Sequence, residues 1–181
     1  MSTAELEAKL RNRVSAGKRA KEASRQIRDI GEIPPPADPK RRNKCQHDFR
    51  AFCEQYFPEV FYLPWSEDQL RCIEKIETVI LDGALFALAM PRGSGKTALC
   101  QTAVCWAQAY GHRRYIYFLG DDQESAEDSL LSIKTEWEAN PRLAEDFPEI
   151  CVPLLKAEGI TSRFRGQICN ERRVQCMWVS V

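Results

Sequence analysis

The sequence predicts an α/β protein with an incomplete parallel sheet and a basic helical arm at its N-terminus. Two apolar runs, 84–89 and 114–119, have the length and composition of strands buried on both faces of a parallel sheet. Helix-forming residues from Thr97 to Tyr110 lie between them, and strand–helix–strand units of this kind build parallel sheets. The two runs are therefore expected to lie parallel in one sheet.

Composition narrows the class of protein. The chain has 181 residues, 44% hydrophobic and 29% charged, as is usual for a soluble globular protein. The longest uncharged apolar run, Gly83 to Pro91, has nine residues. A membrane span needs about 20, so no membrane association is expected. The N-terminus lacks the apolar core of a secretory signal, which favours a cytoplasmic protein with reduced cysteines and without secretion.

Charge divides the chain into two parts. Residues 1–44 contain 12 Lys and Arg against 6 Asp and Glu, whereas residues 45–181 contain 14 against 20. Three consecutive prolines, followed by the basic cluster Lys40-Arg41-Arg42-Asn43-Lys44, end the first part. We therefore expect a basic helical arm with a proline-rich linker over 1–44 and a globular body over 45–181. Such an arm either contacts DNA phosphates or is a solvated tail, and charge alone leaves both interpretations open.

Local signals define the other elements in order. Ser66 and Gln69 have the spacing of a capping box, which starts a helix. Asn140-Pro141 is a typical N-cap and first-turn pair. We also expect helices over 48–56 and 124–138, an irregular stretch over 151–169 and a final strand over 173–181.

The turn between the first apolar run and the helix after it has the residues of a phosphate-binding loop. We call Met90–Thr97 the phosphate loop. Gly93 and Gly95 allow backbone N–H groups to converge on phosphate oxygens, and the following helix adds its positive end. Lys96 is placed to reach the β- and γ-phosphates, and the Thr97 hydroxyl to hold Mg²⁺. The full pattern has glycine where this chain has Met90, so the motif is a variant.

Two further segments have two interpretations each. Gln69 either only completes the capping box or also contacts an adenine base, as in ATPases that carry an aromatic residue and a glutamine upstream of the phosphate loop; Trp65 would be that aromatic. Asp121-Asp122 follows the second apolar run and could hold Mg²⁺ as a Walker B motif. The acidic stretch continues beyond them, which favours the start of a helix stabilised by its dipole.

From the aromatic loop at 57–65 to Trp178, about three quarters of the chain, the sequence resembles the large terminase subunit of tailed bacteriophages. The matching stretches are Leu63-Pro64-Trp65-Ser66-Glu67-Asp68-Gln69, Ala89-Met90-Pro91-Arg92-Gly93-Ser94-Gly95-Lys96-Thr97, Gly120-Asp121-Asp122-Gln123-Glu124-Ser125-Ala126 and Phe147-Pro148-Glu149-Ile150. The variant phosphate loop, with Arg92 and without the first glycine, is similar to that of the family.

The resemblance implies a RecA-like P-loop NTPase fold and the ATP-binding part of a motor that packages DNA into a capsid. It implies that ATP and Mg²⁺ are bound by Arg92, Gly93, Ser94, Gly95, Lys96 and Thr97, with Trp65 and Gln69 at the base. Its partners would be double-stranded DNA, the portal and the small terminase subunit, in a homo-oligomer.

The family's Walker B aspartate, catalytic glutamate and nuclease domain have no counterpart in this sequence, so no catalytic residue is expected in it. The chain resembles a truncated terminase without turnover. The alternatives are a non-enzymatic fragment from a defective prophage and another helicase-like P-loop ATPase.

Overall fold

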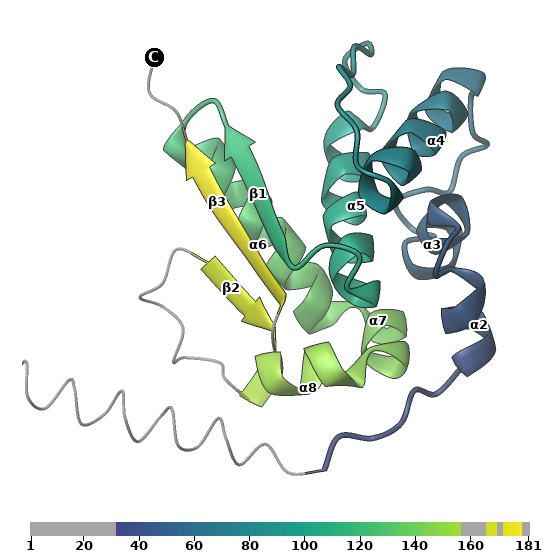
Figure 1. The fold of residues 1–181 in the computed structure, drawn as a ribbon, viewed down its shortest axis with the longest axis vertical. Helices are drawn as coiled ribbons and strands as arrows, with labels where there is room; N and C mark the ends of the chain where they lie inside the picture. The colour runs from purple at the N-terminus through teal and green to yellow at the C-terminus, as the bar shows by residue number, and fades with distance from the viewer. Residues whose placement is uncertain (1–31, 157–165, 170–171, 179–181) are drawn as a thin grey trace, which may run out of the picture.

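The computed structural model describes residues 32–156, 166–169 and 172–178. Seven helices and three strands lie in these ranges (Figure 1). In chain order they are α2 (Pro39–Lys44), α3 (Phe49–Tyr56), α4 (Glu67–Leu81), α5 (Lys96–Tyr110), β1 (Tyr115–Gly120), α6 (Gln123–Ala139), α7 (Pro141–Asp146), α8 (Pro148–Lys156), β2 (Gly166–Cys169) and β3 (Arg172–Trp178). No helix of the described ranges is both long and apolar enough to cross a membrane.

The predicted fold class is wrong. Between residues 32 and 156 the chain is 60% helix and 5% strand, and it forms no sheet of its own. The single strand there, β1, pairs in parallel with β3, and β2 pairs antiparallel with β3. The expected parallel sheet of an α/β P-loop NTPase, with a RecA-like order of strands, is thus replaced by a mostly helical arrangement.

The error lies in the first apolar run. Residues 84–89 form no strand, and their side chains are mostly exposed, with Leu85 entirely so. An apolar run shows that a segment can be buried, but a strand also needs a neighbour for its backbone hydrogen bonds. Here β1 makes its ladder with β3, so the parallel pairing predicted between 84–89 and 114–119 does not form.

Elements with a local signal were predicted well. Ser66 and Gln69 form a complete capping box at the start of α4. Asn140 caps α7 with its side chain, Asp48 caps α3, and Gly111 ends α5. The stretch from 151 was predicted to be irregular, but α8 continues to Lys156, with Pro153 in its interior.

The hydrophobic core lies between the helices. Its largest fully buried side chains include Trp106 of α5 and Trp137 of α6. Each indole N–H is satisfied: Trp106 donates to the carbonyl of Cys45 at 2.9 Å, and Trp137 donates to the Gln108 amide oxygen at 2.8 Å. Because these donors have partners, the two large rings can be buried without loss of hydrogen bonding. The helix α6 also packs against β1 and β3 (Figure 1).

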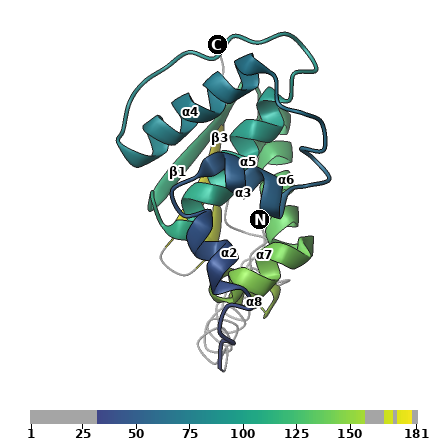
Figure 2. The same cartoon turned by 90° about the vertical axis from the view of Figure 1, so that its right-hand side faces the viewer.

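One buried carboxylate joins the two ends of the helical part. Asp146, at the end of α7, is fully buried and accepts hydrogen bonds from Arg41 Nε at 2.6 Å, Tyr56 Oη at 2.7 Å and the Asp38 amide at 3.0 Å. Figure 2 shows α2, α7 and α8 together at one end of the molecule. Burial alone raises the pKa of Asp146, but Arg41, Tyr56 and the Asp38 amide together hold it below its ordinary value.

A second arginine of the same helix adds to this contact. Arg42 donates to the Asp146 carbonyl and pairs with the Glu149 carboxylate of α8. Its guanidinium lies 4.8 Å from the centre of the Phe147 ring, and its own carbonyl accepts from the Tyr110 hydroxyl at 2.7 Å. The basic segment of α2 is therefore docked on the acidic ends of α7 and α8.

Asp146→Asn should lower the free energy of unfolding at pH 7 by about 3 kcal/mol, because Arg41 keeps a half-buried charge without its main partner. The pKa of Asp146 is lower in the folded chain than in the unfolded one. Its contribution is therefore complete above the unfolded pKa, near 3.9, and is lost as the pH falls through the folded pKa. Denaturant unfolding at pH 7 and pH 3 should show that the free energy of unfolding falls less on acidification in the variant than in the original chain.

Glu145→Gln is the matched control. Glu145 pairs with the same arginine, but its carboxylate is 53% exposed, so its loss should cost under about 1 kcal/mol. Equal losses in the two variants would contradict the role assigned to Asp146.

Candidate functional site

The phosphate loop joins the extended segment after α4 to the start of α5. Gly93 and Gly95 have φ of 80° and 81°, the left-handed region that other residues rarely adopt. Open space surrounds the position of a Cβ at both glycines, so it is the backbone conformation that requires them. No side chain caps α5, whose N-cap is Gly95. The first N–H groups of this helix therefore lack the side-chain acceptor that a polar N-cap residue supplies.

Lys96, the first residue of α5, folds back into the loop. Its Nζ donates to the carbonyls of Met90 and Pro91, the latter at 3.1 Å. The Ser94 hydroxyl donates to the same Pro91 carbonyl at 2.8 Å. The loop thus presents a cation and a helix N-terminus at one place, which is a combination suited to an anion.

Two contacts with α4 hold the loop. The Gln69 Nε2 donates to the Ser94 carbonyl at 3.2 Å, while its Oε1 accepts from the Ser66 amide at 3.0 Å. At the start of the loop, Met90 Sδ lies 3.3 Å from Cys72 Sγ of α4. Gln69 therefore completes the capping box, as one interpretation held, and also reaches the phosphate loop. Met90, which replaces the usual glycine, packs against α4.

Trp65 lies against α3. Its indole N–H donates to Glu54 Oε1 at 2.8 Å, and its ring centre lies 5.0 Å from that of Phe61. Hydrogen bonds from Arg50 and Trp65 hold the pKa of Glu54 below its ordinary value. Trp65 also lines a shallow groove of about 530 Å³ with Tyr62 and Leu63, two exposed apolar side chains.

The other predicted ligands lie at the surface. Arg92 and Thr97 are exposed, and Thr97 is the second residue of α5. The structure thus brings Gln69, Ser94 and Lys96 together around the loop, with Arg92, Gly93, Gly95 and Thr97 adjoining them in the chain. It places Trp65 in a separate contact.

Asp121 and Asp122 immediately precede α6. The Asp122 carboxylate accepts from the Ser125 amide at 2.7 Å and is the N-cap of this helix. Hydrogen bonds from Ser125 hold its pKa below the ordinary value. The favoured interpretation, a helix start, is therefore confirmed for Asp122.

The basic cluster is only partly available to an anionic partner. Arg41 and Arg42 are engaged with Asp146, Glu145 and Glu149, whereas Lys40 and Lys44 are exposed. The helical arm predicted before Glu32 lies outside the described residues. Among those residues, six cysteines form no disulfide, and no group of three His, Cys, Asp or Glu side chains could hold a metal ion.

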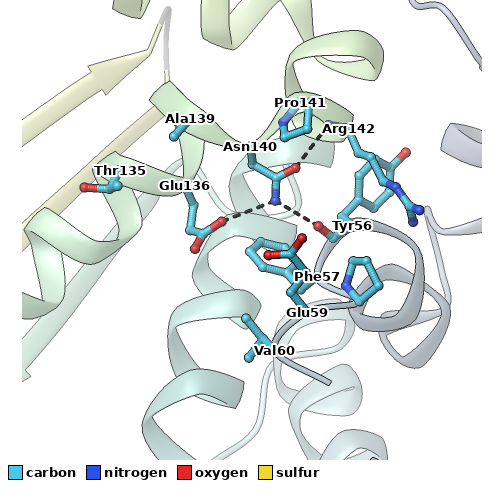
Figure 3. A pocket seen from close by; sticks show the side chains of 11 residues that line it. Tyr56, Phe57, Glu59, Val60, Thr135, Glu136, Ala139, Asn140, Pro141 and Arg142 are labelled. Carbon is cyan, nitrogen blue, oxygen red and sulfur yellow. Dashed lines mark hydrogen bonds between the residues drawn. The ribbon is translucent and has the colours of Figure 1, made fainter. Parts of the chain in front are cut away.

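A cavity of about 310 Å³ was missed by sequence reasoning (Figure 3). It lies between the end of α3 and the junction of α6 with α7. The Asn140 amide group organises its wall by donating to the Tyr56 carbonyl at 2.8 Å and to Glu136 Oε2 at 3.2 Å. Phe57 and Val60 supply apolar surface. The first and last of its lining residues, Tyr56 and Arg142, are 86 positions apart in the chain, so no local pattern marks them.

Comparison with known proteins gives no family. No family model matches this chain, and neither does any curated protein or solved structure.

Gln69→Ala should loosen the phosphate loop as well as the start of α4, because its side chain bonds to both. Ser66→Ala is the matched control, since it removes the cap and leaves the contact with Ser94. Each loss of a capping bond should cost about 0.5–2 kcal/mol. In Gln69→Ala, hydrogen exchange of the amides over 92–95 should be faster than the loss of global stability alone explains. In Ser66→Ala it should increase only as much as the loss of global stability explains. Equal acceleration in both would show that Gln69 acts only as a cap.

Proposed function

We propose that the phosphate loop binds a nucleoside triphosphate with Mg²⁺, and that the chain is the ATP-binding part of a terminase-like DNA-packaging motor. The observation that carries the proposal is that Gly93, Gly95 and Lys96 lie together at the N-terminus of α5, which no side chain caps. A triphosphate needs converging N–H donors and a cation, and this segment supplies both.

The residues of the loop fit the triphosphate in three ways. The left-handed glycines leave room for phosphate oxygens near the backbone, because neither carries a Cβ. The Lys96 ammonium has only neutral carbonyl partners in the described structure, and a phosphate oxygen would give it a stronger, charge-assisted bond. The Thr97 hydroxyl is exposed on the first turn of α5, where it would hold Mg²⁺.

The contacts with α4 support the proposal from outside the loop. In a complete P-loop protein the loop follows a strand, and that strand is absent here. Gln69 and the Met90–Cys72 contact hold the loop instead. Gln69 bonds to the Ser94 carbonyl of the loop, and the proposal also assigns it the contact with the base of the nucleotide, which is the second interpretation of this residue.

The proposal covers binding and not turnover by this chain. Hydrolysis needs a carboxylate to hold Mg²⁺ and a group to orient water. The Asp122 carboxylate already caps α6, where it accepts from the Ser125 amide. Partners that the resemblance implies, which are double-stranded DNA, the portal and the small terminase subunit, remain predictions. The pairing of Arg41 and Arg42 with carboxylates leaves Lys40 and Lys44 as the exposed cations of that cluster.

Lys96→Ala should weaken binding of a fluorescent ATP analogue to the full chain about ten- to a hundredfold, because a charge-assisted contact contributes about 1.5–3 kcal/mol. Removing Mg²⁺ with EDTA should weaken binding less in Thr97→Ala than in the original chain. Both are measured by fluorescence titration with and without Mg²⁺.

Lys75→Ala, which removes an exposed lysine from α4, is the control and should bind as the original chain does. Equal affinity of the original chain, Lys96→Ala and Lys75→Ala would reject the phosphate loop as the site. Binding without any hydrolysis would separate the ATP-binding proposal from an active motor.

A further inference from the structure

The edge strand β1 is open on one side. It lies at one end of the strand order β1-β3-β2, so β3 pairs with one of its edges and no other described residue pairs with its second edge. Such an edge carries unpaired N–H and C=O groups and is a template for another strand. Natural proteins commonly block it with a proline or an inward-pointing charge, and the sequence Tyr115-Ile116-Tyr117-Phe118-Leu119-Gly120 contains neither.

One face of β1 is also uncovered. Tyr115, Tyr117 and Leu119 are 62%, 57% and 58% exposed, whereas Ile116 and Phe118 between them pack on the core. Exposed apolar side chains that gather on one face of a strand form a patch of the kind that meets a partner.

The helices leave space beside this strand. A cavity of about 310 Å³ adjoins Tyr115, Ile116 and Tyr117, and its far wall comes from Ile80 of α4 and from Ala103, Val104 and Ala107 of α5. The space beside the first half of the open edge is therefore lined by small and apolar side chains together with Arg113.

The charges at the two ends of β1 are opposite. Arg113 and Arg114 precede it, and Asp121 and Asp122 follow it. None of the salt bridges found in the described ranges involves Arg113 or Asp121, and the guanidinium of Arg113 only reaches the Val79 carbonyl at 3.5 Å. A strand with this pattern is complementary to a second copy of itself that runs in the opposite direction.

Symmetry fixes the register of such a pair. Two antiparallel copies side by side are related by a two-fold axis perpendicular to the sheet, which keeps side chains of one face opposite each other. Placing Tyr117 opposite the Tyr117 of the second copy puts Tyr115 opposite Leu119 and Arg113 opposite Asp121. All exposed side chains then meet across the pair, and each end is closed by an ion pair.

We propose that β1 is a self-association edge, and that two copies of this chain pair antiparallel through it in the register centred on Tyr117. A second copy is favoured over an unrelated partner because one strand carries both charges in the order that self-pairing needs. The inference does not depend on nucleotide binding.

The test is sedimentation velocity on the full chain over a range of micromolar concentrations. The original chain should sediment as a dimer at the upper end. Arg113→Asp and Asp121→Arg should each raise the dissociation constant at least about tenfold, because two ion pairs become two like-charge contacts. The double variant Arg113→Asp/Asp121→Arg should recover the dimer. Asp128→Arg, which reverses an exposed charge on α6, should leave the dimer unchanged.

Tyr117→Lys gives a second measurement, since it places two ammonium groups at the two-fold axis and should abolish pairing. Circular dichroism establishes which variants are folded, so that a loss of dimer is not a loss of structure. A monomeric original chain at every concentration would overturn the proposal, as would a double variant that stays monomeric while folded. A dimer that survives Tyr117→Lys would show that another surface holds the two copies.

Discussion

The buried Asp146 carboxylate is the interaction on which the helical part of this chain depends. Taking a carboxylate out of water costs several kcal/mol unless donors and an opposite charge replace the water. Here the donors come from the loop before α2, from α2 itself and from α3, through Asp38, Arg41 and Tyr56. The acceptor comes from α7, at least 90 positions further along the chain. One charge therefore fixes the place of three segments, and α3 in turn brings Phe49 and Phe52 into the core.

That constraint also determines what the basic cluster can do. A run of lysine and arginine looks like a free cationic surface when it is judged by sequence alone. In the folded chain its two arginines neutralise acidic side chains of α7 and α8, and Arg42 lies over the Phe147 ring. The charges of the two arginines are therefore largely neutralised by carboxylates within the molecule. The acidic body and the basic segment compensate each other through specific pairs as well as through their net charge.

The features that could be predicted from sequence are the helix starts and ends that short segments determine by themselves. The capping box at Ser66, the Asn140 cap and the end of α5 at Gly111 depend on residues within four positions, and all three are found. The run 84–89 was mistaken for a strand because strand formation depends on a partner elsewhere in the chain. The contact of Gln69 with Ser94 joins residues 25 positions apart, so the capping pattern could predict only half of its role. The cavity around Asn140 had no sequence signal at all.

The parallel pairing of β1 with β3 has a consequence for the order of folding. Tyr115 lies opposite Arg173, so the chain must close a loop that includes α6, α7 and α8 before the first rung can form. Closing a long loop lowers the entropy of the chain before any stabilising contact has formed, so non-local contacts of this kind slow folding. The helices, whose hydrogen bonds are local, can form on a much shorter timescale. The strand β1 is thus expected to be the last element to find its partner, and both of its edges stay open during synthesis until β3 arrives.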